Sequence, residues 1–333
     1  MASARPIAVL GAGSWGTALA IQIARAGHEV RLWGIESDQI TAMQQQRSNP
    51  FYLPDIKFPE SLQPETDLQK SVEQADILLL AVPSHAFRGF IRSAKQYIRH
   101  DHRLVWATKG LEEGTAKLMH QIVAEELPDC HLTAVVSGPT FAGEVARNLP
   151  TAVTVASASA SVAEEVSACL HHGNFRTYRS EDILGVELGG SLKNVLAIAA
   201  GIADGLGFGA NTRAALITRG LTEIMRLGHA MGASRETFMG LAGLGDLVLT
   251  CTDNQSRNRR MGLKLAEGIG IDDARKQIGQ AVEGVKTAKE ASTLAKQYQV
   301  ELPIMEQVYR VLFEGKSPRE AVTDLLSREA KSE

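Results

Sequence analysis

The feature that most constrains this chain is a glycine-rich turn near its start. An apolar run at residues 6–10, PIAVL, leads directly into Gly11-Ala-Gly13-Ser-Trp-Gly16, and a helical pattern follows. His28–Trp33 is then predicted to form a second strand, which completes a βαβ unit. In such a unit the first glycine permits a tight turn, the second lets the backbone approach a pyrophosphate, and the third lets helix and strand pack closely. We therefore predict a dinucleotide site rather than a glycine-rich turn without a ligand.

Three positions bear on how the dinucleotide is held and on whether it is NAD or NADP. Ser14 and Trp15 occupy the variable positions of the turn, where a hydroxyl and backbone N–H groups can reach phosphate oxygens. Glu36 lies 20 residues after Gly16, where an acidic side chain would hydrogen-bond the adenosine ribose of NAD; the alternative is a solvated loop carboxylate. No arginine immediately follows the second strand, so a 2′-phosphate lacks an evident partner. We predict NAD or NADP as cofactor, with a preference for NAD.

The hydrophobic pattern changes along the chain in a way that predicts two domains. Apolar runs predict further strands over residues 76–82, 103–107, 132–136, 151–156 and 175–178. Residues 47–66 hold four prolines and are expected to be irregular. After about Asp182 helical patterns dominate. The fold class predicted is therefore an α/β N-terminal Rossmann-type doubly wound sheet, residues 1–184, followed by an all-α C-terminal domain, residues 185–333.

Composition excludes several classes of function. The 333 residues carry a net charge of −3, which argues against a broad electrostatic surface for nucleic acid. The three cysteines lie far apart and indicate reduced thiols, and no metal site is expected. The N-terminus resembles neither a signal nor a transit peptide, and no apolar run approaches the roughly 18 residues of a membrane span. We expect a soluble, cytoplasmic protein; a homodimer is compatible with the sequence.

Three predicted strands are followed directly by stretches that contain candidate ligand-binding residues. Their carboxyl ends carry VPSHAF at 82–87, ATKG at 107–110 and SGPTFA at 137–142. In doubly wound sheets ligands bind beyond the carboxyl ends of strands, so Lys109 is expected to meet a phosphate or a substrate oxygen rather than to be an ordinary surface lysine. Phe87 and Phe141 either line a nicotinamide pocket or belong to the core.

The helical half opens with the stretch LGGSLKNVL at 188–196. Side chains on a helix lean over the preceding turn, which puts Lys193 above Gly189 and Gly190. Two helical glycines cost roughly 1 kcal/mol each relative to alanine, which suggests that something approaches the helix closely there. A buried lysine amine can serve as acid and base for a carbinol, whereas simple helix packing with Lys193 at the rim is the alternative.

A second polar cluster lies at residues 243–260. Asp246 sits in a glycine-flanked loop and is expected to hydrogen-bond a hydroxyl or Lys193. Ser256, Arg257 and Asn258 lie near a predicted helix start, where a guanidinium fork and backbone N–H groups suit a phosphate. Arg259, Arg260 and Lys264 are expected to form a solvated basic face instead. Cys251 lacks an evident base and is not expected to be a nucleophile.

Long stretches of this sequence resemble the bacterial-type NAD(P)-dependent glycerol-3-phosphate dehydrogenases. They are GAGSWGTALA, VPSHAF, WATKGLE, SGPTFA, GGSLKNVLAIAAG, GFGANTRAALITRG, GLGDLVLTCTDNQSRNRR and VEG at 282–284. Members of this family interconvert glycerol 3-phosphate and dihydroxyacetone phosphate, which supplies glycerol phosphate for phospholipid synthesis. The resemblance covers essentially the whole chain and implies the same activity here.

The resemblance also implies roles for individual residues. It makes Lys193 the proton-transferring residue. The implied substrate contacts are Lys109, Gly138, Thr140, Lys193, Asp246, Ser256, Arg257 and Asn258. The implied cofactor contacts are Ser14, Trp15, Lys109, Ala142, Arg257, Ala281 and Glu283. Bacterial members often have a basic residue where this chain has Ile35, which argues against a strong preference for NADP.

Two other functions remain compatible with the residues. A β-hydroxyacid-type dehydrogenase also combines a Rossmann domain, a helical domain and a lysine, and its carboxylate substrate would suit the same arginine. A non-catalytic dinucleotide sensor would need neither Lys193 nor Arg257.

Overall fold

The computed structural model describes residues 5–279 and 281–328, and these divide into two compact units. Unit 1 contains the described residues up to Lys109 together with Leu118–Val186. Unit 2 contains Gly110–Lys117 and the described residues from Glu187 onward. The short segment joins unit 2 because Ser191 Oγ accepts from the Gly110 N–H at 2.9 Å and Glu290 accepts from the Gly114 N–H at 3.0 Å.

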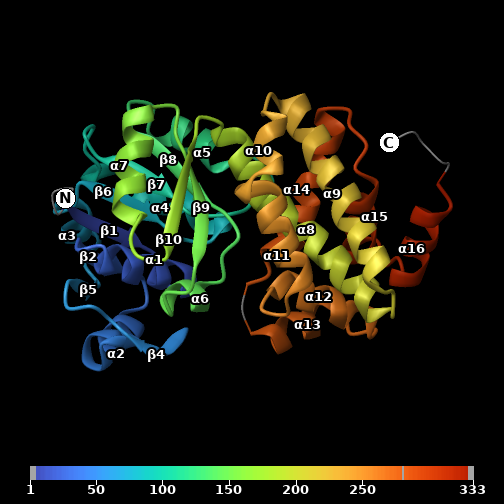
Figure 1. Ribbon diagram of the computed structural model, residues 1–333, viewed down its shortest axis with the longest axis horizontal. Coiled ribbons are helices and arrows are strands. Elements are labelled where there is room, and N and C mark those ends of the chain that lie inside the picture. Colours follow the sequence, from blue (N-terminus) through green and yellow to red (C-terminus); the bar gives the residue numbers. More distant parts are fainter. Residues whose placement is uncertain (1–4, 280, 329–333) are drawn as a thin grey trace. The chain divides into compact units, whose positions relative to one another are not determined.

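An eight-stranded sheet forms the centre of unit 1 (Figure 1). Its strands are β1 (Pro6–Leu10), β2 (Glu29–Trp33), β5 (Leu62–Glu65), β6 (Ile77–Leu80), β7 (Arg103–Trp106), β8 (Thr133–Ser137), β9 (Thr151–Ala156) and β10 (Phe175–Ser180). The order is β10-β9-β8-β7-β6-β1-β2-β5, and only the β8–β9 pair is antiparallel. The chain leaves β1 towards β2 and β5 and then returns to its other side at β6. This reversal creates the crevice between β1 and β6 where such sheets bind ligands.

Helices form two layers over this sheet. They are α1 (Ser14–Arg25), α2 (Ser37–Gln46), α3 (Leu68–Glu73), α4 (Ser84–Ala94), the 3₁₀ turn η1 (Lys95–Tyr97), α5 (Met119–Glu126), α6 (Ala142–Ala146) and α7 (Ala160–Leu170). Helix α1 packs against α6 and α7, whereas α4 packs against α3 and α5. Right-handed crossovers in opposite directions from β1 and β6 place these groups on opposite faces. The doubly wound sheet predicted from the sequence is confirmed.

The proline-rich stretch at 47–66 differs from the prediction. It contains β3 (Ser48–Asn49), which pairs antiparallel with β4 (Leu53–Lys57), as well as β5 of the main sheet. The expectation of an irregular segment was therefore wrong for these strands. Pro64 belongs to β5, the edge strand, and pairs with Leu32 of β2. Proline is tolerated at this position because no further strand needs its missing N–H.

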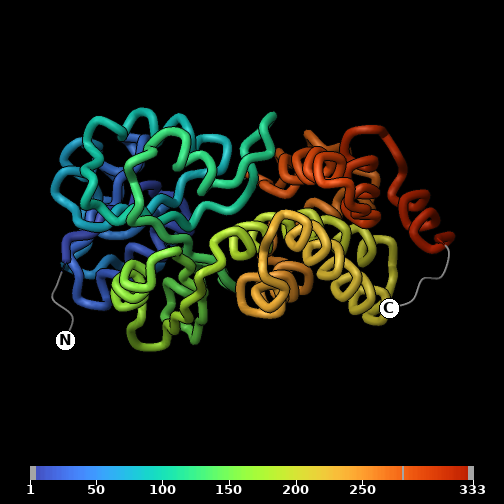
Figure 2. The backbone as a smooth tube through the Cα atoms, turned by 90° about the horizontal axis from the view of Figure 1, so that it is seen from above, coloured from blue at the N-terminus to red at the C-terminus, as the bar shows by residue number. Residues whose placement is uncertain are grey.

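Unit 2 is helical, as predicted, and is coloured from green to red in Figures 1 and 2. Its elements are α8 (Ile183–Gly205), α9 (Ala210–Met231), α10 (Arg235–Met239), the π-helical turn η2 (Leu241–Gly245), α11 (Asp246–Thr252), α12 (Arg257–Ala266), α13 (Ile271–Ile278), α14 (Glu283–Gln297), α15 (Pro303–Phe313) and α16 (Pro318–Leu326). Helix α8 begins in unit 1 and is the central helix of unit 2, where Leu192, Val195 and Leu196 are fully buried.

Helix α8 bears on the prediction that no apolar run is long enough to span a membrane. By length and composition it is apolar enough to cross a membrane, although it is not an uninterrupted apolar run. In the structure 89% of its most apolar window is buried inside the protein. It also carries Glu187 and Lys193, both buried. The apolar composition of α8 is thus accounted for by its position as a core helix.

Candidate active site

The glycine turn between β1 and α1 has the geometry that a dinucleotide requires. Gly11 has φ +124°, and a Cβ there would lie 2.8 Å from the Ala81 backbone beyond β6. A Cβ at Gly16 would lie 1.9 Å from the Gly11 carbonyl oxygen. A Cβ at Gly13 would meet nothing within 4 Å. Gly11 and Gly16 therefore permit the fold, while Gly13 leaves open space at the N-terminus of α1, where backbone N–H groups favour an anion.

Two side chains around this turn, those of Trp15 and Asn49, also fit a dinucleotide site. The indole Nε1 of Trp15 is buried and has no hydrogen-bond partner within the described chain, so an acceptor from a ligand would satisfy it. Asn49 donates to the Ala12 carbonyl oxygen at 3.0 Å and to Thr17 Oγ1 at 2.8 Å. Asn49 was missed by sequence reasoning because it lies 37 positions from Ala12, inside the segment expected to be irregular. It holds the turn in shape.

The two residues expected to distinguish NAD from NADP lie in the short segment between β2 and α2. Glu36 immediately precedes α2, three residues after the end of β2, and its side chain is exposed. Ile35 is 81% exposed and brings no cation to this position. A carboxylate here can accept hydrogen bonds from ribose hydroxyls but would repel a 2′-phosphate.

Lys109, Gly138 and Thr140 come together beyond the carboxyl ends of β7 and β8. Lys109 Nζ donates to the Gly138 carbonyl oxygen at 3.1 Å, and Thr140 Oγ1 donates to the same oxygen at 3.3 Å. Ala142 begins α6 directly afterwards. Phe87, left open between pocket and core, is fully buried and packs edge-on against Trp106, so it belongs to the core.

A second group of polar residues is buried in unit 2 around Lys193. Lys193 is 6% exposed and Asp246 is fully buried. Lys193 Nζ donates to the Asp246 carboxylate and, at 2.9 Å, to Thr250 Oγ1. Thr250 Oγ1 in turn donates to the Asp246 carbonyl oxygen at 2.6 Å, one turn earlier in α11. The expected pairing of Asp246 with Lys193 is present, and Thr250, which sequence reasoning missed, completes a three-residue network.

The close approach to α8 that its glycines suggested is present at Gly189. A Cβ at Gly189 would lie 2.5 Å from the Ala242 carbonyl oxygen in η2. The group that approaches α8 there is therefore the protein's own π-helical turn. The η2 turn that packs on Gly189 leads directly into Asp246 at the start of α11.

The N-terminus of α12 is tied to α8 and α14 through two asparagines. Asn258 Nδ2 donates to Asn194 Oδ1 at 2.8 Å, and Asn258 Oδ1 accepts from the Gly284 N–H at 2.9 Å. A Cβ at Gly284 would lie 2.6 Å from the Asn194 carbonyl oxygen, so only glycine permits this approach. Ser256 is the N-cap of α12, and its Oγ accepts from the Arg259 N–H at 3.2 Å.

The basic residues of α12 separate into different environments. Arg257 is exposed at the first position of the helix. Arg259 is buried, donates to the Cys251 carbonyl oxygen at 3.1 Å and pairs with Asp204 at 2.5 Å. The expectation of a solvated face was wrong for Arg259, because Asp204 at the end of α8 draws it inward. Burial raises the pKa of Cys251 to about 12, so this thiol is not a nucleophile at neutral pH.

The last two expected cofactor contacts flank the start of α14. Ala281 is exposed, and Glu283 is the first residue of the helix. Glu283 therefore lies in the same first turn as Gly284, whose N–H is held by Asn258. The helix start thus carries both a predicted cofactor contact and a link to the α12 terminus.

Comparison with known proteins places both units in one family. The chain matches the N-terminal part of NAD-dependent glycerol-3-phosphate dehydrogenases over residues 6–163 and their C-terminal part over residues 182–323. It is 58% identical over 329 residues to glycerol-3-phosphate dehydrogenase (NAD(P)+) of Thioalkalivibrio sulfidiphilus, covering 98% of each chain.

A solved structure supports the same family, and a more distant one shares the fold. A crystal structure of glycerol-3-phosphate dehydrogenase from Coxiella burnetii superposes with a TM-score of 0.93 at 50% identity, covering 98% of this chain and 99% of that one. A D-mandelate dehydrogenase bound to NADH superposes with a TM-score of 0.61 at 12% identity, covering 93% and 98%, which shows a shared fold alone. The chain belongs to the family of NAD-dependent glycerol-3-phosphate dehydrogenases.

Proposed function

We propose that this protein interconverts sn-glycerol 3-phosphate and dihydroxyacetone phosphate with NAD(H) or NADP(H). The observation that carries the proposal is the buried Lys193 amine held by Asp246 and Thr250, in a chain whose relatives bear the name of this activity. The hydroxyacid dehydrogenase alternative has only a fold-level likeness behind it, to a D-mandelate dehydrogenase, whose named substrate is an α-hydroxyacid and not a β-hydroxyacid. A non-catalytic sensor would have no need of a buried amine supported in this way.

In this proposal Lys193 exchanges the proton on the substrate's C2 oxygen. During reduction the Lys193 ammonium donates a proton to the oxygen as it becomes a hydroxyl, and during oxidation the neutral amine accepts it. Asp246 and Thr250 hold the amine in one orientation and stabilise its charge. The bound nicotinamide supplies the hydride-accepting and hydride-donating chemistry at C2.

The substrate phosphate is assigned to the N-terminus of α12. Arg257 is exposed there and offers a planar fork of N–H donors. The Asn258 amide is already bonded to Asn194 and Gly284, so we expect Asn258 to contribute mainly its backbone N–H. Ser256 orients these N–H groups by capping the helix. Fixing the phosphate positions C2 near the amine. Lys109, Gly138 and Thr140 are proposed as further substrate contacts.

The cofactor is assigned to the glycine turn and the residues around it. Gly11, Gly13, Gly16, Ser14 and Trp15 would hold the pyrophosphate and its surroundings, and Glu36 the adenosine ribose. Further contacts are proposed for Lys109, Ala142, Arg257, Ala281 and Glu283. The exposed carboxylate of Glu36 beside Ile35 supports a preference for NADH over NADPH.

We extend the proposal to the two domains and to the role of the whole protein. Residues 1–184 bind the dinucleotide and residues 185–333 bind the substrate. The enzyme acts in the cytoplasm, as a homodimer, and supplies glycerol phosphate for phospholipid synthesis. The homodimer can be checked by sedimentation at several protein concentrations.

The direct test follows oxidation of NADH and of NADPH by ultraviolet absorbance with dihydroxyacetone phosphate. Phosphate-free dihydroxyacetone is the matched control, because it retains the C2 carbonyl and lacks only the group assigned to Arg257. We expect rapid oxidation with the phosphate ester and almost none with the control. No oxidation with the phosphate ester would refute the proposed function, and equal rates with both ketones would refute the assigned phosphate site.

A further inference from the structure

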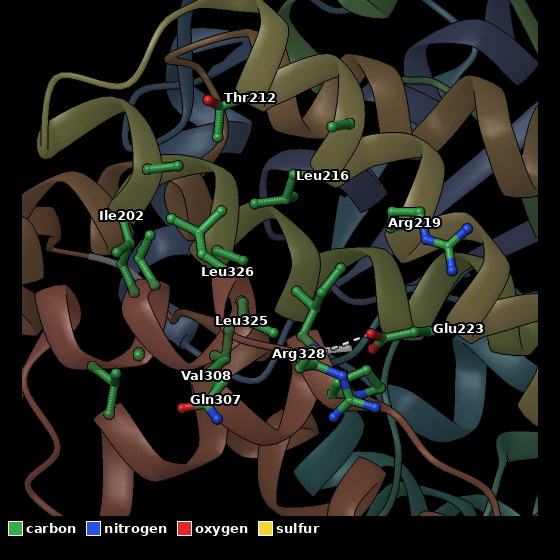
Figure 3. A pocket seen from close by; sticks show the side chains of 18 of the residues that line it. Ile202, Thr212, Leu216, Arg219, Glu223, Gln307, Val308, Leu325, Leu326 and Arg328 are labelled. Carbon is green, nitrogen blue, oxygen red and sulfur yellow. Dashed lines mark hydrogen bonds between the residues drawn. The ribbon is translucent and has the colours of Figure 1, made fainter. Parts of the chain in front are cut away.

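Unit 2 contains a pocket lined by none of the residues assigned above to catalysis or to substrate and cofactor binding. It has a volume of about 440 Å³ and lies between the second half of α8, α9, α15 and α16 (Figure 3). This volume falls within the roughly 300–1,000 Å³ typical of small-molecule sites. The walls come from four helices of the same unit, so the pocket does not depend on where unit 1 lies.

Most of the pocket wall is apolar. Ile202 and Val308 form part of its buried floor, and Leu216, Leu325 and Leu326 project from α9 and α16 (Figure 3). Helix α16 packs against α15, yet Leu326 on its pocket-lining face remains 76% exposed. Apolar surface that faces a hollow of this size gains free energy when a hydrocarbon chain replaces water there.

Charged side chains gather at one end of the pocket. Figure 3 shows Arg219, Glu223 and Arg328 on one side, apart from the leucines. Arg328 pairs with Glu301 at 3.1 Å, whereas Arg219 is exposed and makes no ion pair with any residue that the structure describes. The Glu223 carboxylate accepts the Ile304 and Met305 N–H groups at 2.7 and 3.1 Å, which directs it towards the start of α15.

The charged groups leave an excess of positive charge at this end. Three arginines line it, Arg219, Arg226 and Arg328, against the two carboxylates of Glu223 and Glu301. Burial raises the pKa of Glu223 to about 7, which weakens its negative charge further at neutral pH. An apolar hollow with a cationic end is complementary to a molecule that has a hydrocarbon chain and one anionic head.

We propose that this pocket binds the alkyl chain of a long-chain carboxylate, with the head group at Arg219. The occupant is a single-chain amphiphile and not a bilayer, because the hollow is a partly open pocket between four helices of one unit and not a flat apolar surface. Each methylene buried strengthens binding about fourfold, so affinity should rise steeply with chain length. A methyl ester or an alkyl trimethylammonium of equal length should bind more weakly than the carboxylate, since neither pairs with a guanidinium.

The test is calorimetric titration of the full chain with octanoate, decanoate and dodecanoate below their micelle concentrations. Ala215 lines the pocket and is exposed, so Ala215→Trp should fill the space while the protein folds normally. Thr218→Trp is the matched control, because Thr218 is exposed on the same helix and does not line the pocket. We expect Ala215→Trp to weaken dodecanoate binding at least tenfold and Thr218→Trp to leave it unchanged.

The head group is tested separately. Arg219→Gln should weaken carboxylate binding about tenfold and leave the methyl ester unaffected, whereas Arg319→Gln, an exposed change on α16 outside the lining, should alter neither. The proposal is overturned if dodecanoate shows no saturable binding, if affinity does not rise with chain length, or if Ala215→Trp binds like the unmodified protein. It is equally overturned if Ala215→Trp splits a dimer in sedimentation, because the occupant would then be a second copy.

Discussion

Lys193 of α8 donates a hydrogen bond to the carboxylate of Asp246, the first residue of α11, 53 positions later in the chain. Both side chains are buried, so each charge depends on the other for its stability. Thr250, one turn further along α11, accepts from the same amine. The arrangement fixes the buried amine in one orientation.

Removing the amine should abolish proton transfer without disturbing the dinucleotide site. Lys193→Ala is expected to reduce kcat about 10²–10⁴-fold, the range for loss of a general acid. NADH affinity, measured by quenching of protein fluorescence, should stay within a factor of about two. Near-normal turnover in this variant would contradict the assignment of Lys193.

Removing the carboxylate charge beside the Lys193 amine should lower kcat even though the amine itself is retained. Asp246→Asn preserves the shape of the side chain but loses the ionic partner, so we expect kcat to fall about a hundredfold. Thr250→Val, which removes one neutral acceptor, should cost about tenfold. If both variants changed only KM, Asp246 and Thr250 would be substrate contacts rather than supports for Lys193.

Arg257 should affect binding of the phosphate rather than the chemical step. A hydrogen bond to a charged group contributes about 1.5–3 kcal/mol, so Arg257→Gln is expected to raise KM for dihydroxyacetone phosphate roughly 10–100-fold. Steady-state kinetics measures this change. Arg235→Gln, at an exposed arginine of α10, is the control and should leave KM unchanged. A normal KM in Arg257→Gln would place the phosphate elsewhere.

Cofactor preference should follow charge at positions 35 and 36. The unmodified enzyme is expected to have a higher kcat/KM with NADH than with NADPH. The double change Ile35→Arg and Glu36→Ser supplies a cation and removes the repulsion, so the ratio should shift towards NADPH at least tenfold. An unchanged ratio would mean that the adenosine ribose is recognised by other residues.

Glu223 should make stability depend on pH. Burial raises its pKa in the folded protein from 4.5 to about 7, so between these values the folded state holds more protons than the unfolded state. This contribution is fully present below about pH 4.5 and is lost as pH rises through about 7, with a size of about 3 kcal/mol. In urea unfolding, Glu223→Gln should remove this part of the pH dependence, and Glu267→Gln, at an exposed site, should retain it. Parallel pH profiles for all three proteins would contradict the shift.

Local signals in the sequence were sufficient for the elements of regular structure. The glycine turn, the buried parallel strands and the helix start near Ser256 each depend on residues within a few positions of one another, so their geometry follows from backbone sterics and periodicity. The segment at 47–66 was misjudged because β5 is stabilised by pairing with β2, and proline content alone does not report that partner.

The sequence indicated the residue types of the candidate site, but it indicated fewer of the hydrogen bonds between them. Lys193, Asp246 and Arg257 stand out because charged residues beside glycines or helix starts have a chemical reason to be there. Thr250 and Asn49 carry no such local signal, and their roles depend on distant partners. The amino-acid sequence by itself therefore determined the two-domain architecture and the glycine turn, and it singled out Lys193 as the candidate acid and base. Only the tertiary structure decided that η2 packs on Gly189, that Arg259 turns inward to Asp204 and that a hollow remains beside α16, because each depends on packing between segments that the chain brings together only when folded.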